Sequence, residues 1–218
     1  MFKGLREFVR SIKARDPAAR NAAQILLLYS GVHALIFYRI AHFFYKIHFY
    51  FIARWISQRG RFCTGIEIHP GATIGKCLFI DHGMGVVIGE TAEIGDYCTI
   101  YQGATLGGTG KDEGKRHPTL GNHVMVGAGA KILGPFKVGD GAKIASGAVV
   151  LSEVPAGTTA VGIPARIVCK KNPAMRQEMD QVHIPDPVSQ ELCRMNARME
   201  EMEKELKRLR EEVNNDIQ

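Results

Sequence analysis

A six-residue aliphatic repeat runs through the middle of this chain and constrains its fold more than any other feature. From Leu120 to Val150 every sixth residue is aliphatic, and Ile68 to Leu106 keeps the same interval with one two-residue shift between Ile80 and Ile88. A period of six fits neither a helix nor a simple strand. It is typical of a β-solenoid, in which each repeat forms one side of a coil and points its aliphatic residue inward. The small residues that follow many repeats suit tight corners.

The chain divides into four predicted regions of an α+β protein. Residues 1–62 are expected to be helical, residues 63–170 to form the solenoid, residues 171–187 to link, and residues 188–216 to form an amphipathic helix or coiled coil. Asp16-Pro17 predicts the start of the second helix, with Asp16 as its N-cap. The polar, glycine-rich stretch 107–118 interrupts the repeat and is expected to leave the wall as a loop.

The predicted coiled coil depends on apolar residues at alternating spacings of four and three, which is an a/d heptad seam. Its members are Val188, Leu192, Met195, Met199, Met202, Leu206, Leu209 and Val213. The alternative is a single amphipathic helix that packs on the protein's own body.

Composition narrows the function classes. The net charge of +6 mildly favours anionic ligands, but no dense basic block with interleaved aromatic residues indicates nucleic-acid binding. The five cysteines form no CxxC pair and no signal peptide precedes them, which predicts a cytoplasmic protein with reduced thiols. The charge-free run from Ala22 to Tyr38 is interpreted as buried or partner-packed helices and not as a membrane span.

Three short polar stretches are candidates for chemistry. Glu67-Ile68-His69-Pro70 opens the solenoid, Asp81-His82-Gly83 lies where the repeat shifts, and Arg116-His117 closes the loop. A histidine held by a carboxylate can act as a general base. An arginine can bind a substrate carboxylate through its planar fork of N–H groups. Because a solenoid wall has no deep pocket, function is expected between subunits or under the loop.

Together with longer motifs, these stretches resemble the serine O-acetyltransferases of the cysteine pathway. The motifs are Ile68–Gly75, Asp81–Thr91, Thr105–Lys111, Lys115–Pro118 and Gly162–Arg166. The resemblance covers about residues 14–170. It implies a left-handed parallel β-helix that assembles as a homotrimer, or as a pair of trimers, with active sites between adjacent subunits.

The resemblance also implies catalytic roles. His82 is expected to take the proton from the serine hydroxyl as it attacks the thioester of acetyl-CoA, giving O-acetyl-L-serine. Glu67 aligns with the family's Asp that partners this histidine, so the charge is kept on a longer side chain. His117 matches a neighbouring residue of the site, with both a catalytic and a substrate-binding role.

Further positions are expected to bind the substrates. Asp16 and Asp81 match residues around the ammonium group of serine, and Arg116 matches the residue near its carboxylate. The coenzyme A contacts fall on Ala128, Lys143 and Ser146, together with Gly108, whose backbone N–H is expected to bind the developing oxyanion. An activated thioester needs a base and positioning, so no metal is expected.

The family also implies partners. L-cysteine is expected to inhibit by feedback, and a complex with cysteine synthase is suggested because many members end in a docking Ile. This chain departs from the better-known members in two ways. Only about 60 residues precede the solenoid, and the sequence ends Asn215-Asp216-Ile217-Gln218.

Other functions stay open from the sequence. Hexapeptide solenoids also host carbonic anhydrases, and His69, His82 and His117 are formally available as zinc ligands. A non-catalytic scaffold that acts through its coil is a second alternative. A third is an O-acetyltransferase for another small acceptor, such as homoserine or a sugar.

Overall fold

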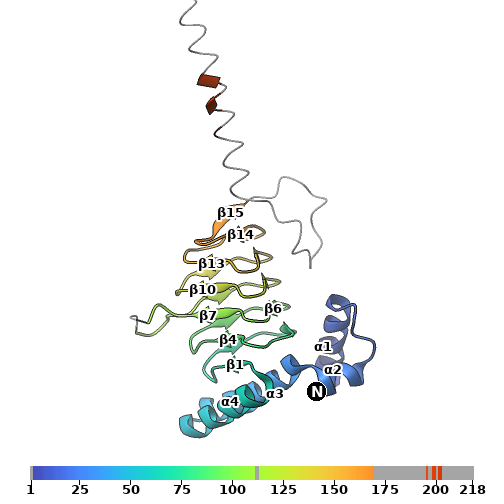
Figure 1. Ribbon diagram of the computed structural model, residues 1–218. Coiled ribbons are helices and arrows are strands. Elements are labelled where there is room, and N and C mark those ends of the chain that lie inside the picture. Colours follow the sequence, from blue (N-terminus) through green and yellow to red (C-terminus); the bar gives the residue numbers. More distant parts are fainter. Residues whose placement is uncertain (1, 111–112, 169–194, 196–197, 200, 203–218) are drawn as a thin grey trace, which may run out of the picture. The chain divides into compact units, whose positions relative to one another are not determined.

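The computed structural model describes residues 2–110, 113–168, 195, 198–199 and 201–202 (Figure 1). The chain divides into two units, Met1–Ile184 and Pro185–Gln218. In the second unit the five described residues are helical and exposed, and three of them, Met195, Met199 and Met202, belong to the predicted seam. The rest of the seam, the linker and the C-terminal residues lie outside the described residues.

Four helices precede the solenoid: α1 (Phe2–Arg15), α2 (Ala22–Leu28), α3 (Ser30–Lys46) and α4 (Tyr50–Thr64). The prediction that Asp16 caps the second helix was wrong. Asn21 is the N-cap of α2, and its side chain accepts a hydrogen bond from the Gln24 backbone N–H at 2.8 Å. Asp16 instead accepts from the Ala18 backbone N–H at 2.8 Å, which closes a local turn before the helix begins.

Fifteen short strands of the described chain form three parallel sheets, with one antiparallel pair, β14–β15, at the end. Their bounds follow the chain. Sheet A has β1 (Glu67–Ile68), β4 (Val87–Ile88), β7 (Thr105–Gly107), β10 (Lys131–Leu133) and β13 (Val149–Val150). Sheet B has β2 (Thr73–Ile74), β5 (Glu93–Ile94), β8 (Thr119–Leu120) and β11 (Lys137–Val138). Sheet C has β3 (Phe79–Asp81), β6 (Thr99–Tyr101), β9 (Met125–Val126), β12 (Lys143–Ile144), β14 (Thr159–Val161) and β15 (Arg166–Val168).

The aliphatic repeat stacks in register inside the coil, as the sequence predicts. In sheet A, Ile68 pairs with Ile88, Ile88 with Leu106, and Leu106 with Ile132. These residues are buried, and the corresponding residues of sheets B and C complete one continuous core. Consecutive coils therefore share a single apolar interior, which makes a chain of such short strands stable.

One corner of the coil is held by a ladder of side-chain hydrogen bonds. Asp96 accepts from the Lys76 backbone N–H at 2.7 Å, Asn122 from Asp96 at 2.8 Å, and Asp140 from Asn122 at 2.8 Å. A Cβ at Gly95 would lie 2.7 Å from the Asn122 amide oxygen. The glycine before each of these backbone donors therefore leaves room for the side chain of the following coil that accepts the hydrogen bond.

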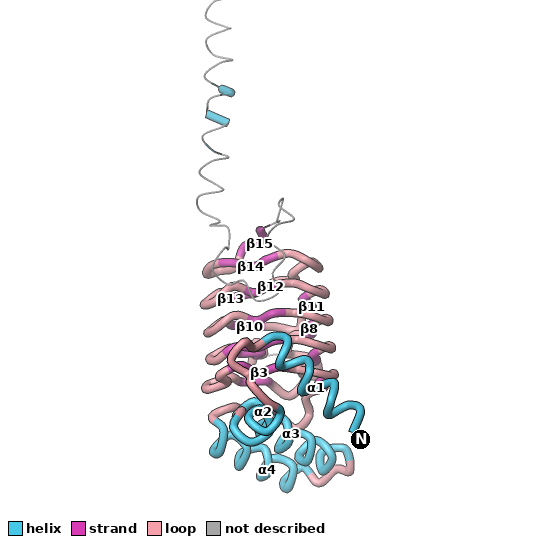
Figure 2. Tube along the Cα trace, turned by 90° about the vertical axis from the view of Figure 1, so that its right-hand side faces the viewer, coloured by secondary structure: helices cyan, strands magenta, loops and turns pink. Residues whose placement is uncertain are grey.

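Helices α3 and α4 cover the first coil, below β1 in Figure 1 and in the side view of Figure 2. The Tyr38 hydroxyl donates to the Ala72 carbonyl at 2.7 Å, and the Ser57 hydroxyl donates to the Ile68 carbonyl at 2.8 Å. At the start of α3, a Cβ on Gly31 would overlap the backbone of Ile80. Helix α3 thus begins directly against the last residues of β3.

A buried arginine fastens α1 to the side of the solenoid. Arg15, 8% exposed, donates to the carbonyl of Cys77 at 2.7 Å, the carbonyl of Cys98 at 2.9 Å and the hydroxyl of Thr99 at 3.1 Å. Its ring contact is Phe79, with the guanidinium carbon 5.4 Å from the ring centroid. These contacts fix the C-terminal end of α1 beside β3 and β6.

In the part of the chain that the structure describes, no single helix is long and apolar enough to cross a membrane. Ala22–Leu28 and Ser30–Lys46 meet the length and composition criterion only as a pair, with a bend of 63° between them.

Candidate active site

The end of β3 carries a group of residues that we name the carboxylate cluster: Asp16, Tyr29, Asp81 and His82. Asp81 is the last residue of β3, and His82 starts the turn that leads to β4. Asp16 follows α1, so the Arg15 anchor brings it to the same edge. The Tyr29 hydroxyl donates a short hydrogen bond to the second oxygen of Asp16. Both Asp16 oxygens therefore have a donor, which fixes the carboxylate in one orientation.

The nearby Asp16 carboxylate affects the pKa values of Asp81 and Tyr29. Burial raises the pKa of Asp81, the nearby Asp16 carboxylate raises it further, and His82 opposes the shift. Burial and the hydrogen bond to Asp16 raise the pKa of Tyr29 to about 12. Two neighbouring carboxylates in a half-buried place are suited to a cationic ligand, because a cation relieves their mutual repulsion.

His82 projects from this edge in an unusual backbone conformation. Its φ is 56°, in the left-handed region that residues other than glycine seldom adopt. The Ser30 hydroxyl and the Met84 backbone N–H hold its carbonyl at 3.1 and 3.0 Å. The imidazole is 75% exposed, and its Nε2 lies 4.0 Å from the nearer Asp81 oxygen. The ring is therefore available to a substrate beside the carboxylate pair.

Glu67, the expected partner of His82, has other contacts in this chain. Its two carboxylate oxygens lie 3.0 Å from Arg54 and 3.4 Å from Arg61, both on α4. No hydrogen bond or ion pair joins Glu67 to His82 among the described residues. The pairing of Glu67 with His82 stays a prediction.

A second group, which we name the arginine cluster, lies on the corner between sheets A and B: His69, Glu90, Arg116 and His117. One guanidinium nitrogen of Arg116 donates a short bond to Glu90, and the Tyr45 hydroxyl donates to the other Glu90 oxygen at 3.0 Å. Burial alone would raise the pKa of Glu90, but the bonds from Arg116 and Tyr45 outweigh it and lower the pKa. Glu90 thus orients Arg116 as an ion-paired fork.

The two histidines of the arginine cluster favour the neutral state. Burial lowers the pKa of His69, and burial together with the Arg116 charge lowers the pKa of His117. A pocket of about 510 Å³ adjoins the cluster, with His69 and Glu90 in its wall beside Tyr45, Tyr50, Arg54 and Pro70.

The predicted coenzyme positions fall on later coils. Along the corner between sheets C and A, the Gly103 N–H donates to Met84, Gly129 to Gln102, and Gly147 to Ala128, each at 2.8 Å. Ala128 and Ser146 therefore continue the corner on which His82 lies, two and three coils along, or roughly 10 and 14 Å. Lys143 begins β12 on the adjoining sheet. Gly108 instead packs on Arg116, where an added Cβ would lie 2.9 Å from the Arg116 carbonyl oxygen.

The chain does not bring all of the predicted site residues together. The two clusters occupy different corners, and no hydrogen bond or ion pair between them is found among the described residues. Within that part of the chain no three His, Cys, Asp or Glu side chains could hold a metal ion. His69 and His117 lie in one cluster and His82 in the other, so a zinc site of these three would need a second subunit.

Sequence reasoning missed several residues that build the site. Tyr29 hydrogen-bonds to Asp16 and Glu90 to Arg116, Tyr45 in turn holds Glu90, and Arg15 places Asp16. Glu90 follows the repeat glycine Gly89, on the coil before the one that carries Arg116 and His117. This position in the repeat was the one sequence signal that could have indicated Glu90. No local pattern indicates the others.

Comparison with known proteins identifies the family. The bacterial transferase hexapeptide (six repeats) family model matches residues 117–152. The serine acetyltransferase of Bacillus subtilis (strain 168) is 50% identical over 213 residues, 98% of each chain. That of Helicobacter pylori (strain ATCC 700392 / 26695) is 68% identical over 155 residues, 71% of this chain and 91% of its own. The chain belongs to the serine acetyltransferase family. It is an acyltransferase.

Similar solved structures indicate the same family. The serine acetyltransferase of Neisseria gonorrhoeae superposes with a TM-score of 0.75 at 41% identity, covering 82% of this chain and 70% of that one. Its complex with serine (TM-score 0.73, 41% identity, 77% and 68% covered) is also similar. So are two serine acetyltransferase complexes, one with CoA (0.72, 40%, 76% and 68%) and one with cysteine (0.74, 42%, 77% and 69%). The family and the left-handed parallel β-helix preceded by helices are thereby confirmed.

Proposed function

We propose that this chain transfers the acetyl group of acetyl-CoA to the hydroxyl of L-serine, giving O-acetyl-L-serine for cysteine synthesis, with His82 as general base. The observation that carries the proposal is the half-buried pair Asp16 and Asp81 beside an exposed imidazole. The pair suits an ammonium group, and the imidazole suits a hydroxyl a short distance away. Relatives described as complexes with serine, CoA and cysteine support the ligand classes.

In the proposed reaction the His82 imidazole accepts one proton and later gives it up. His82 takes the proton of the serine hydroxyl while the oxygen attacks the thioester carbonyl. The tetrahedral intermediate collapses, the carbon–sulfur bond breaks, and the leaving thiolate takes the proton from the imidazolium. Arg116 would bind the serine carboxylate, and backbone N–H groups near Gly108 would stabilise the oxyanion. Coenzyme A would follow the corner from His82 past Ala128 to Ser146, with Lys143 near a phosphate.

Thiol release from acetyl-CoA tests the function. The purified protein is supplied with L-serine, D-serine, L-homoserine or a sugar in parallel, and the product is identified by mass. L-serine should give the largest kcat/KM. A preference for homoserine or a sugar would replace the substrate assignment, and stoichiometric zinc without thiol release would favour the carbonic anhydrase alternative.

Binding of L-serine should weaken at acid pH if Asp81 holds its ammonium group. Because the pKa of Asp81 is raised, the carboxyl protonates at a higher pH than an ordinary aspartate and then loses its attraction for the cation. Below that pKa the affinity should fall by roughly tenfold per pH unit. Calorimetry from neutral to acid pH measures this directly, and binding should release protons in the affected range. Asp81→Asn should bind weakly with a flatter profile; an unchanged profile would contradict the role.

We further propose a homotrimer in which the carboxylate cluster of one subunit faces the arginine cluster of the next. Each cluster has only part of the required groups, and the two lie on different corners of the coil. Light scattering should give three times the 24.0 kDa chain mass. A doubled value would indicate paired trimers, for which exposed Phe43, Tyr50 and Phe51 are a candidate surface.

Mixed subunits test the shared site. At a serine concentration near the wild-type KM, His82→Ala and Arg116→Ala proteins should each have little activity, whereas trimers assembled from an equal mixture should contain about a quarter of sites with both residues intact. Activity should therefore return on mixing. If mixed trimers form and stay as inactive as either parent, the two clusters do not meet between subunits.

We also propose how the protein is regulated and where it acts. L-cysteine has the ammonium and carboxylate groups of serine, so it should compete for the same site. A cysteine synthase complex through the C-terminal residues is also proposed, although those residues lie outside the described part. Free thiols at Cys63, Cys77 and Cys98 are consistent with action in the cytoplasm.

A further inference from the structure

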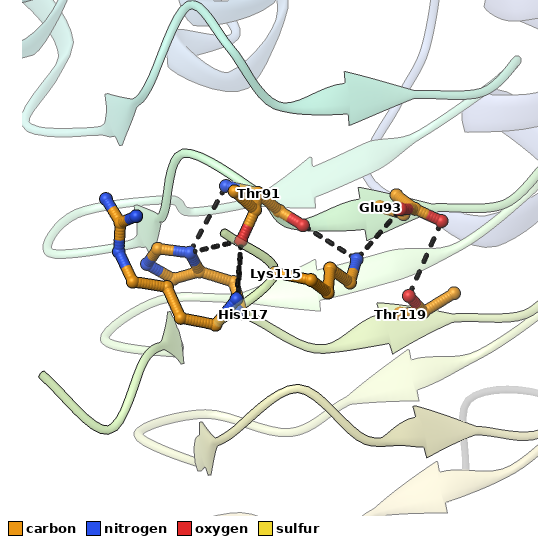
Figure 3. Close-up of polar contacts among 6 residues, drawn as sticks. Thr91, Glu93, Lys115, His117 and Thr119 are labelled. Carbon is orange, nitrogen blue, oxygen red and sulfur yellow. Dashed lines mark hydrogen bonds and ion pairs between the residues drawn. The ribbon is translucent and has the colours of Figure 1, made fainter. Parts of the chain in front are cut away.

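Thr91 lies at the centre of the hydrogen bonds that hold the returning loop (Figure 3). Its hydroxyl oxygen accepts from the backbone N–H of Arg116 at 3.0 Å and from that of His117 at 3.1 Å. The same oxygen lies 2.9 Å from Nδ1 of His117. A hydroxyl has two acceptor lone pairs and one proton. With both lone pairs occupied, the Thr91 hydroxyl can only donate to Nδ1.

A second donor reaches the same ring nitrogen. The Thr91 backbone N–H, which has no acceptor function, lies 3.2 Å from Nδ1. A proton on Nδ1 would face this N–H directly, so the geometry favours an unprotonated Nδ1. The lowered pKa of His117, caused by burial and then by Arg116, agrees with a neutral ring.

The other side of the ring is fixed by space. A Cβ on Gly89 would overlap Cδ2 and Nε2 of His117, so the imidazole fits between Gly89 and Thr91 only because residue 89 is glycine. The Lys115 ammonium donates to the Thr91 carbonyl at 2.7 Å and to Glu93 at 2.9 Å, which ties the incoming chain to the same turn.

Nε2 is left for a ligand. No described residue makes a hydrogen bond to it, yet no buried side-chain nitrogen or oxygen of the described chain lacks a partner. Nε2 therefore keeps access to solvent although His117 is only 8% exposed. A neutral ring with an unprotonated Nδ1 presents an N–H at this position.

We propose that Thr91 is a positioning residue that holds His117 as the Nε2–H tautomer, so that His117 donates a hydrogen bond to a substrate oxygen and does not act as the base. This inference rests on the proposed function and separates the two roles that the sequence left to His117. The base is then His82 alone, and His117 supplies a fixed dipole toward the oxygen that gains charge.

The tautomer is measured without reference to activity. Full-length protein carrying 15N-labelled histidine is studied by long-range 1H–15N correlation at neutral pH, with His117→Gln to assign the signals. Wild type should show an unprotonated Nδ1 and a protonated Nε2 at His117. A proton on Nδ1, or a charged ring, would overturn the inference even if serine acetylation is confirmed. If serine is not the substrate, the tautomer result still stands by itself.

Two substitutions of Thr91 then link the tautomer to turnover. Thr91→Val keeps the shape but removes the hydroxyl, and should mix the tautomers and lower kcat by roughly 10- to 100-fold, with a smaller change in the KM for serine. Thr91→Ser restores the hydroxyl and should be close to wild type. Thr119→Val is the matched control, because within the described chain the Thr119 hydroxyl hydrogen-bonds to Glu93 alone, at 3.5 Å. A Thr91→Val protein with wild-type tautomer and kcat would refute the role. If that variant does not fold, the wild-type spectrum and Thr91→Ser still decide.

Discussion

Replacement of His82 by alanine is expected to lower kcat by roughly 10²–10⁴-fold, the usual contribution of a general base. The serine hydroxyl is a weak nucleophile, and His82 is the exposed imidazole beside the proposed ammonium site. The KM for serine should change much less, since Asp16 and Asp81 remain. Steady-state thiol release with a saturating acetyl-CoA concentration measures both parameters. A variant with near-wild-type kcat would remove His82 from the mechanism.

Glu67 variants refine this result. If Glu67 only orients the His82 ring, Glu67→Gln should reduce kcat less than His82→Ala, and Glu67→Asp should remain active. In the single chain, however, Glu67 is bound to Arg54 and Arg61. Arg61→Ala is therefore a useful companion: it removes one of these ion pairs without touching the proposed substrate groups.

Replacement of Arg116 by alanine is expected to weaken L-serine and L-cysteine together, by roughly 10- to 100-fold in serine KM and in the cysteine inhibition constant. Both ligands have a carboxylate, and Arg116 has a partly exposed guanidinium already oriented by Glu90. Arg116→Lys should recover only part of the loss, because an ammonium lacks the planar fork.

The control is Arg59→Ala, whose guanidinium lies over Trp55 on α4, 5.5 Å from the ring centroid. It should bind both ligands as wild type does. Weakened serine with unchanged cysteine would mean that the two ligands use separate sites, and inhibition that saturating serine does not relieve would mean the same. Unchanged binding of both ligands would remove Arg116 from the substrate site.

The repeat made the solenoid predictable to the level of register, because a side chain every six residues must return to the same interior. Its two interruptions were also informative. The extra residues after Ile80 form the turn of His82, and those after Leu106 carry Arg116 and His117. The regular coils are needed to close the core, so the candidate site residues lie where the six-residue repeat is interrupted.

Contacts between distant segments could not be predicted in the same way. Tyr29 meets Asp16 across a turn and a short helix, and Thr91 meets His117 across an inserted loop. The helix start was assigned to Asp16 because Asp-Pro is a common cap. The same carboxylate instead bonds Ala18 and Tyr29, an outcome that depends on tertiary neighbours.

Because of the Arg15 anchor, ligand affinity depends on the docking of helix α1, which takes place away from the ligand. Asp16 reaches the site only while α1 is docked, and docking rests on the Arg15 guanidinium, which bridges Cys77, Cys98 and Thr99, and on the apolar packing of Ile12 with Phe79. An amine that binds Asp16 and Asp81 must therefore also stabilise the docked helix, since the two equilibria are thermodynamically linked. Docking of the N-terminal helix therefore preorganises the ligand site. Weaker docking of α1 lowers the apparent affinity for the ligand even when every ligand contact is intact.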